Sequence, residues 1–296
     1  MSTSNSWKFC FKASVERKVR RTVGFWKMFS PEDHIAVAVS GGKDSLTMLL
    51  VLKKLASRFP RTRVTAVTID EGIAGYREEA VELAARYCKE LGVAHEIVSF
   101  QDIYGYGLDG FLRQKRERMS ACSYCGVFRR KAINLAARKV GATKIATAHN
   151  LDDMLQTYML NLLEGDVERF VRFSPVLQDP RGRFLTRVKP LSEIPEREVA
   201  LYGYAEGLEF QTASCPYMTE ALRNELRSIF NRLELAHPGV LFSSYRAMLK
   251  LRNLAEPGVP PSELQSCQSC GEPTSSTICE ACRMVGITSQ KLEVPA

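Results

Sequence analysis

One pattern restricts the fold more than any other: a short apolar run that ends in two glycines and leads directly into a helical stretch. Residues 34–40 (HIAVAVS) are apolar and partly β-branched, as in a buried strand, and residues 44–59 place apolar side chains at helical spacing until Pro60. Four such apolar runs alternate with helical patterns, at residues 34–40, 63–70, 94–100 and 143–150. This alternation predicts the α/β class, with a doubly wound parallel sheet that helices cover on both faces.

The predicted strands also indicate where a binding site would lie. They end at Ser40, Asp70, Phe100 and Asn150. In open parallel sheets, ligands bind beyond the carboxyl ends of the strands. We therefore expect these four positions to converge at one edge of the sheet and to border the site.

Length and composition exclude several classes of protein. The 296 residues allow one large domain and a small one, and 45% hydrophobic with 25% charged residues is typical of a soluble globular protein. No apolar run reaches the roughly 18 residues of a membrane span, and the basic N-terminus lacks the apolar centre of a secretory signal. We expect a cytoplasmic protein, with a transit peptide at the N-terminus as the alternative.

The charge of the chain favours a polyanionic partner. The net charge is +8, and residues 8–27 and 113–131 each contain seven Lys or Arg and a single acidic residue. Either run alone fits a solvent-exposed helix face as well as it fits a nucleic-acid contact. Two such runs that flank a candidate site make nucleic acid the better interpretation.

The junction at residues 40–45 (SGGKDS) predicts a phosphate-binding loop. A loop that leaves a strand and opens a helix presents free N–H groups and the positive end of the helix dipole, and its glycines allow a phosphate to approach closely. The Walker A pattern is not met because Asp44 follows Lys43, which disfavours transfer of a γ-phosphate. The loop residues are Ser40, Gly41, Gly42, Lys43, Asp44 and Ser45.

Nine cysteines are many for a compartment in which disulfides are disfavoured, so clustered cysteines indicate ligands or catalysts. Cys122 and Cys125 precede a predicted helix, whose N-terminus, together with Arg129 and Arg130, lowers the pKa of a thiol. Alone, this C-x-x-C pair fits a redox pair, half a zinc site or two iron–sulfur ligands. Cys215 adds a third thiol: three thiolates on a four-iron cluster leave one iron without a protein ligand, whereas zinc would require a fourth ligand or water. Cys215 also fits a buried small residue.

A second group of cysteines follows a Pro-rich linker near the C-terminus. The spacing C-x2-C-x8-C-x2-C predicts a closed tetrahedral zinc site. A segment of about 30 residues is too short to bury a core unaided, so the metal should supply its folding energy. The predicted ligands are Cys267, Cys270, Cys279 and Cys282.

The string SGGKDS after a strand resembles the loop of the adenine nucleotide α-hydrolase, or PP-loop, superfamily. In that superfamily the loop holds the pyrophosphate of ATP while a nucleophile attacks the α-phosphorus. The resemblance implies that Asp44 holds Mg²⁺ near the phosphates, since hard oxygen ligands suit that ion. It also implies that the main chain at Ala38, Val39, Ser40 and Ile69 surrounds the adenine.

Six motifs narrow the resemblance further. SGGKDS, CSYCG followed by two arginines, AHNLDD, ASCPY, HPG and the C-terminal cysteine pairs occur in that order. This series is similar to the tRNA 2-thiouridine synthetases of the archaeal and bacterial type, which are related to the cytosolic thiouridylases of eukaryotes, and it covers the chain from about residue 14 onward. Asp152 and Asp153 also fit helix N-terminal acids on the dipole. The resemblance implies a [4Fe-4S] cluster on Cys122, Cys125 and Cys215, nucleotide contacts at Arg129 and Ala148, and a role of Asp153 in sulfur transfer.

The implied enzyme is a tRNA sulfurtransferase. ATP with Mg²⁺ adenylates the C2 oxygen of a tRNA uridine, and sulfur from the iron–sulfur cluster replaces AMP to give 2-thiouridine. The implied partners are tRNA, a sulfur donor such as a ubiquitin-like carrier with a C-terminal thiocarboxylate, and a second copy of the chain. The alternatives are a ligase that uses an amine nucleophile, as lysidine synthetases do, synthesis of 2-thiocytidine, and a tRNA-binding scaffold without catalysis.

The predicted division has four parts. Residues 1–30 form a basic helical segment, 31–190 the ATP-binding catalytic domain, 191–256 a helical extension with Cys215, and 263–296 a zinc finger. We expect the finger to form an arm against tRNA, with a dimer contact or an intramolecular contact as alternatives. Members of the resembling family usually open with another zinc module, of which only Cys10 remains here. The basic segment is therefore expected to replace that module in binding tRNA.

Overall fold

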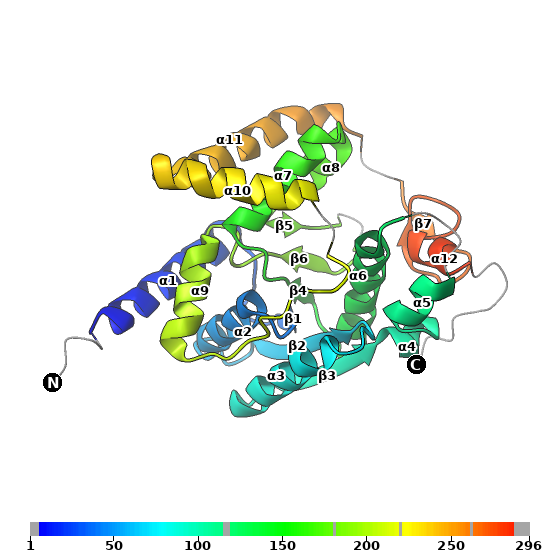
Figure 1. Cartoon of the computed structure of the whole chain (residues 1–296), viewed down its shortest axis with the longest axis horizontal. Helices are drawn as coiled ribbons and strands as arrows, with labels where there is room; N and C mark the ends of the chain where they lie inside the picture. The colour runs from blue at the N-terminus through cyan, green and yellow to red at the C-terminus, as the bar shows by residue number, and fades with distance from the viewer. Residues whose placement is uncertain (1–5, 115–118, 180–181, 219–220, 261–262, 287–296) are drawn as a thin grey trace.

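A computed structural model describes residues 6–114, 119–179, 182–218, 221–260 and 263–286 (Figure 1). Its main sheet has six strands in the order β3-β2-β1-β4-β6-β5, parallel except at the β5 edge. The predicted parallel α/β sheet is confirmed. Strands β5 and β6 were not predicted, because segments of two or three residues are too short to show an alternation of apolar and polar side chains. The strands are β1 His34–Ala38, β2 Arg63–Asp70, β3 Ala94–Ser99, β4 Lys144–Ala146, β5 Val176–Leu177 and β6 Thr186–Val188.

Helices cover both faces of the sheet. On one face α1 (Ser6–Phe25), α2 (Lys43–Ala56), α3 (Arg77–Glu90) and α9 (Glu196–Glu206) share a core with every second residue of β1, including Ile35 and Val37. On the other face Ala36 packs with α4 (Phe100–Tyr104), α5 (Leu108–Gln114) and α6 (Ala121–Lys139). This alternation of faces is what the period of two along a strand requires.

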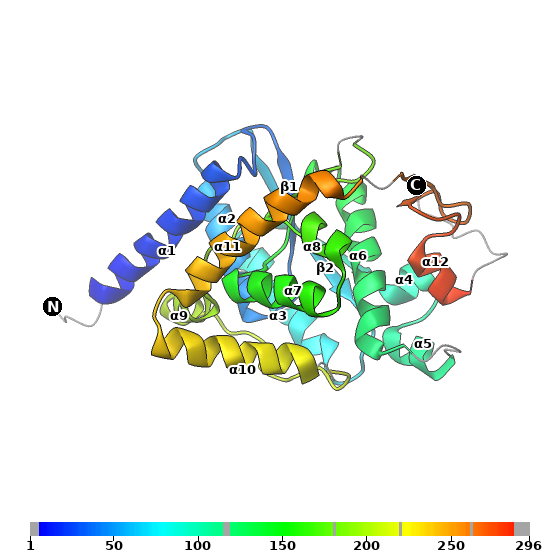
Figure 2. The same ribbon diagram turned by 90° about the horizontal axis from the view of Figure 1, so that it is seen from above.

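A third group of helices lies beyond the β5 edge of the sheet. Helix α11 crosses α7, and α10 packs against both (Figures 1 and 2). Their shared core includes Tyr158 and Phe230. Helix α11 was not predicted. The members are α7 Leu151–Leu163, α8 Val167–Arg172, α10 Ala221–Ala236 and α11 Val240–Ala255, followed by the 3-10 turn Glu256–Gly258.

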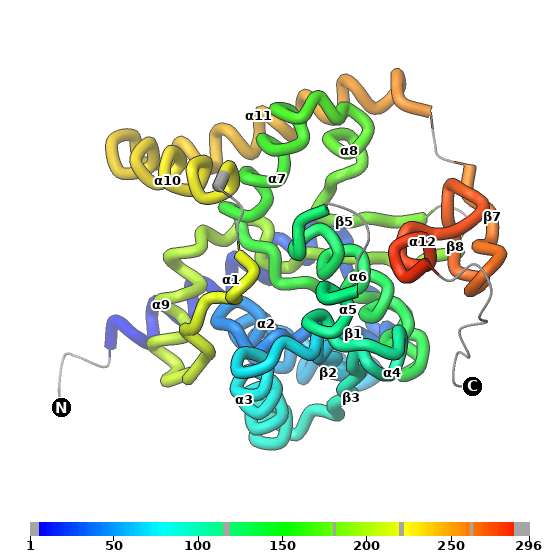
Figure 3. The backbone as a smooth tube through the Cα atoms, turned by 45° about the vertical axis from the view of Figure 1, so that its right-hand side comes forward, coloured from blue at the N-terminus to red at the C-terminus, as the bar shows by residue number. Residues whose placement is uncertain are grey.

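The C-terminal module consists of the hairpin β7 (Gln265–Ser266) and β8 (Pro273–Thr274) and the helix α12 (Glu280–Val285). It packs against α6, with its cysteines in the same apolar core as Phe128 (Figure 3). The intramolecular alternative is therefore the arrangement observed for residues 263–286. Within the described part of the chain, no helix combines the length and the apolar content that crossing a bilayer requires.

Candidate functional site

The strand order reverses between β1 and β4, which is where open α/β sheets bind ligands. A cavity of about 600 Å³ lies at this point and brings most of the predicted site residues together. Two residues of the loop, Gly41 and Lys43, are not part of its wall. The predicted residues that line it are Ala38, Val39, Ser40, Gly42, Asp44, Ser45, Ile69, Cys122, Cys125, Arg129, Ala148, Asp153 and Cys215.

The phosphate loop is closed by its own serines. The Ser45 hydroxyl accepts a hydrogen bond from the Ser40 N–H at 3.0 Å and donates one to the Gly42 carbonyl at 2.9 Å. Gly41 has a φ of +83°, and a Cβ atom there would lie 2.2 Å from the Ala80 carbonyl oxygen of α3. Only glycine fits this position, and the turn that it makes aims the N-terminus of α2 at the cavity.

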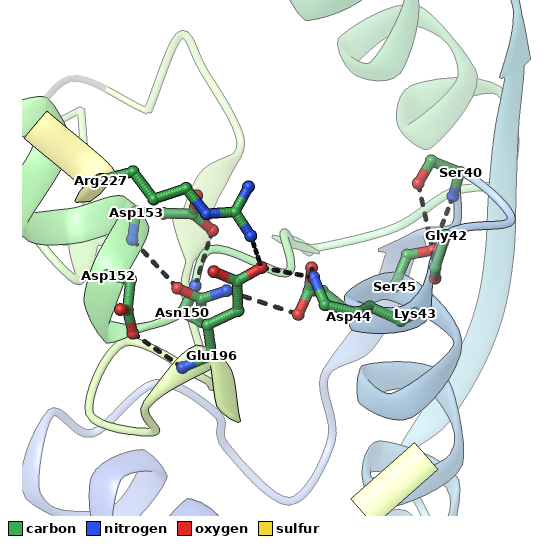
Figure 4. A network of polar contacts seen from close by, with 10 residues as sticks. All are labelled: Ser40, Gly42, Lys43, Asp44, Ser45, Asn150, Asp152, Asp153, Glu196 and Arg227. Carbon is green, nitrogen blue, oxygen red and sulfur yellow. Dashed lines mark hydrogen bonds and ion pairs between the residues drawn. The ribbon is translucent and has the colours of Figure 1, made fainter. Parts of the chain in front are cut away.

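Beside the loop, acidic side chains hold the lysine (Figure 4). Lys43 forms ion pairs with Asp44 at 2.9 Å and with Glu196, at the start of α9, at 2.7 Å. Burial opposes the charge, but the two carboxylates outweigh it and raise the pKa of Lys43. Arg227 of α10 also reaches Glu196, at 2.6 Å. Glu196 thus connects the phosphate loop to α10, and no sequence signal marked it.

The motif AHNLDD forms the N-terminus of α7. Asn150 and Asp153 form a reciprocal capping box, and the Asn150 amide also donates to Asp44 at 3.4 Å. Asp152 Oδ2 accepts a hydrogen bond from the N–H of Glu196, the first residue of α9, at 2.7 Å. Both acids therefore satisfy helix N-termini, as the simpler interpretation predicted. Asp153 differs in that it also lines the cavity, where burial raises the pKa of its carboxyl to about 6.

The three central cysteines line the same cavity as the loop segment. Helix α6 begins at Ala121 with Ser120 as its cap, so Cys122 and Cys125 lie inside its first turns rather than before it. Cys215 comes from the connection between α9 and α10. Burial raises the pKa of the Cys125 thiol despite the nearby Arg129 guanidinium, so the predicted lowering is wrong for this residue. The helix start was misplaced because Ser120 and the residues after it resemble a loop in sequence.

A chain of ion pairs and hydrogen bonds joins these cysteines to the phosphate loop. Arg129 donates to Cys125 Sγ at 3.1 Å and pairs with Glu71 at 2.7 Å, and Glu71 pairs with Arg77 at 2.5 Å. Arg77 in turn donates to the Ser40 and Ile69 carbonyls, at 3.0 and 2.7 Å. Glu71 and Arg77 are only 3% and 5% exposed. Sequence reasoning missed both, although Glu71 directly follows the end of β2.

The main chain near the predicted adenine site is partly engaged. The Val39 carbonyl accepts from Thr68 Oγ1 at 2.8 Å, and the Val39 N–H donates to Val67 at 2.9 Å. Arg77 likewise donates to the Ile69 carbonyl, at 2.7 Å. Ala38 and Ala148, the other two predicted positions, also line the cavity.

The four C-terminal cysteines form a compact site away from the cavity. The sulfur atoms of Cys267, Cys270, Cys279 and Cys282 all lie within 4.8 Å of one another, as four ligands of one tetrahedral ion require. The Lys131 ammonium of α6 lies 3.1 Å from the nearest of these sulfurs. A thiolate site with a dication carries net negative charge, so the buried lysine fits a bound metal.

The chain was compared with known proteins. A sequence model of the PP-loop domain family (ATP_bind_3) matches residues 12–233. The tRNA 2-thiolation protein NcsA of Haloferax volcanii is 36% identical over 290 residues, which cover 93% of this chain and 90% of that protein. The tRNA-5-methyluridine(54) 2-sulfurtransferase of Pyrococcus horikoshii is 38% identical over 280 residues, 95% of this chain and 87% of that protein.

A solved structure agrees with these relatives. The U34-tRNA thiolase NcsA from Methanococcus maripaludis, determined with its [4Fe-4S] cluster, superposes with a TM-score of 0.81 at 34% identity, over 94% of this chain and 88% of that one. The sequence and structure comparisons therefore agree on one family. The chain belongs to the PP-loop family of tRNA 2-thiolation proteins.

Proposed function

We propose that this protein is a tRNA-uridine 2-sulfurtransferase that uses ATP to activate the C2 oxygen of a uridine. The uridine oxygen attacks the α-phosphorus, pyrophosphate leaves, and AMP then departs with the oxygen as sulfur takes its place at C2. One observation carries the proposal: the phosphate loop and three cysteines line the same cavity of about 600 Å³. An adenylated base held there lies within reach of the sulfur chemistry.

The residues of the loop fit the nucleotide. Amides at the start of α2, with Ser40 and Ser45, would bind the phosphates, and Lys43 would exchange its contact with Glu196 for a phosphate oxygen. Asp44 would hold Mg²⁺, which neutralises phosphate charge. Ala38, Val39, Ile69 and Ala148 would surround the adenine, and Arg129 would contact the nucleotide.

The three cavity cysteines fit a [4Fe-4S] cluster in number and chemistry, since three thiolates can bind three irons and all three residues line the cavity. Cys122, Cys125 and Cys215 would hold it, and when bound it supplies the sulfur-handling chemistry of the reaction. The Asp153 carboxyl has a pKa of about 6 and uses Oδ2 to cap α7, which leaves Oδ1 to take up or return a proton near neutral pH. The C-terminal four would hold structural Zn²⁺.

The proposed partners are tRNA, a ubiquitin-like sulfur carrier and a second copy of the chain. A relative in Caenorhabditis briggsae is named a cytoplasmic tRNA 2-thiolation protein, which supports a cytoplasmic location here. The names of two relatives refer to uridines at different positions, 34 and 54. Mass spectrometry of nuclease fragments of tRNA from a deletion strain would identify the position in this organism.

Replacing Cys122 by serine tests the proposal. Protein purified without oxygen should show iron–sulfur absorption, and Cys122→Ser should lose both this absorption and thiolation of tRNA while it still binds tRNA. Cys10→Ser is the control, because Cys10 is exposed on α1 and outside the cavity. Normal thiolation by Cys122→Ser would refute the assignment. A wild-type protein without iron–sulfur absorption that still releases pyrophosphate with tRNA would favour the amine ligase.

A further inference from the structure

Two arginines meet where β6 contacts α6. Arg187 lies on β6, and its guanidinium donates to the Arg130 carbonyl at 2.8 Å and to Asn134 Oδ1 at 2.9 Å. The Arg130 side chain is exposed and turns back along α6, so that its guanidinium lies 3.8 Å from where a Cβ of Gly126 would be. Gly126 is part of the cavity wall. The Arg130 guanidinium therefore lies beside the cavity wall, and Arg187 contacts the backbone of the same residue.

These two arginines differ from their neighbours in having no acidic partner. Arg129, Arg138 and Arg183, on the same side of the molecule, form ion pairs with Glu71, Glu272 and Asp179, respectively. No carboxylate in the described ranges forms an ion pair with Arg130 or Arg187.

The absence of a counter-charge has a cost. Burial, and then the charge of Arg130, lower the pKa of Arg187 to about 10. A partly buried positive charge without a counter-charge, such as that of Arg187, is unfavourable, and a bound anion would relieve that cost. The pair is thus suited to receive an anionic group from outside the chain.

The position favours an RNA phosphate over the phosphates of ATP. Strand β6 is separated from β1, which carries the phosphate loop, by β4, so Arg187 lies two strand spacings, about 10 Å, from the loop strand. Guanidinium groups bind phosphate oxygens in pairs, and phosphate contacts fix the register of a nucleic acid. An enzyme that acts on a base takes that base out of its stack, which leaves its flanking phosphates at the entrance.

We propose that Arg130 and Arg187 form a subsite for a backbone phosphate next to the tRNA nucleotide whose base enters the cavity. This proposal rests on the proposed function, because tRNA is the ligand. The subsite would position the target base without contributing to the chemistry. It would therefore act on tRNA affinity and not on ATP affinity.

The test compares Arg130→Gln and Arg187→Gln with the control Arg61→Gln. Arg61 is 73% exposed and precedes β2, which β1 and β4 separate from β6, and its replacement changes the net charge equally. Binding of an unmodified tRNA transcript is measured against salt, and ATP binding separately. Each subsite variant should weaken tRNA binding and reduce the slope of log K against log salt by about 0.7 to 0.9, with ATP affinity unchanged. Arg187→Lys should recover part of the loss.

Several outcomes would overturn the subsite. Variants with the tRNA affinity and salt slope of Arg61→Gln would refute it while leaving the proposed function intact. A loss of ATP affinity with unchanged tRNA binding would assign the arginines to the nucleotide. If wild-type protein bound no tRNA, both proposals would fail. Because Arg130 is exposed, Arg130→Gln should fold normally, so the test does not depend on the stability of Arg187→Gln.

Discussion

Replacing Gly41 by alanine should destabilise the protein and abolish ATP binding. The backbone at Gly41 has a φ of +83°, and an L-residue in the left-handed region costs about 1–2 kcal/mol. The new Cβ would also lie 2.2 Å from the Ala80 oxygen and 2.7 Å from its Cα, which are backbone atoms of α3. Helix α3 is fixed at Ala80 and Ala84, both fully buried, so separating the two segments adds about 1–3 kcal/mol. The expected loss of unfolding free energy is therefore about 2–5 kcal/mol.

Gly42→Ala is the matched control. Gly42 has a φ of −82°, and the nearest atom to its Cβ position is Ser40 Oγ at 3.6 Å, an ordinary contact. Alanine there also restricts the unfolded chain, so stability should stay constant or rise by about 0.4–1 kcal/mol. Equilibrium unfolding in urea and calorimetric titration with ATP measure both variants. If the two unfolding free energies agreed within about 0.5 kcal/mol, the backbone reasoning would be wrong.

Two further predictions concern buried lysines. Lys131→Met removes an ammonium that lies 3.1, 3.5 and 4.0 Å from three sulfurs of the C-terminal site, so metal affinity measured with a competing chelator should fall by roughly 10- to 100-fold. Lys139→Met, at the end of the same helix and paired with Glu96, should keep the wild-type affinity, and equal affinities in both variants would contradict the assignment. Burial, with the charge of Arg187, lowers the pKa of Lys189 from 10.5 to about 7. Between these two pH values the unfolded chain binds more protons than the folded one, so the free energy of unfolding should rise with pH from about 7 to 10. Lys189→Met should flatten that rise in urea unfolding followed across the range, and an unchanged slope would exclude Lys189 as its source.

The sequence predicts those parts of the molecule that are encoded by nearby residues. Strand β1, the glycine turn and α2 form a continuous local pattern, and parallel strands must bring their carboxyl ends to one edge. The spacing of the C-terminal cysteines likewise specifies a four-ligand site within one short segment. For these features, tertiary structure adds only the positions of elements that are already defined.

Contacts between distant segments could not be predicted. Glu71 and Arg77 connect Cys125 to the phosphate loop, but each looks like an ordinary surface charge in sequence. The basic N-terminal run shows the same limit: Lys12 and Lys18 pair with acids of α9 rather than remaining available to nucleic acid. A count of charges along the chain gives the sign of a partner, but only the fold shows which charges are already neutralised.

Helix α6 contributes residues to three sites of this protein. Consecutive residues on a helix point about 100° apart, so neighbours in sequence reach different partners. Arg129 faces the cavity and Glu71, Arg130 belongs to the proposed phosphate subsite, and Lys131 contacts the cysteines of the C-terminal module. The same helix carries Cys125 in its first turns. The C-terminal module therefore packs on the same helix that carries two of the cavity thiols and one arginine of the proposed phosphate subsite.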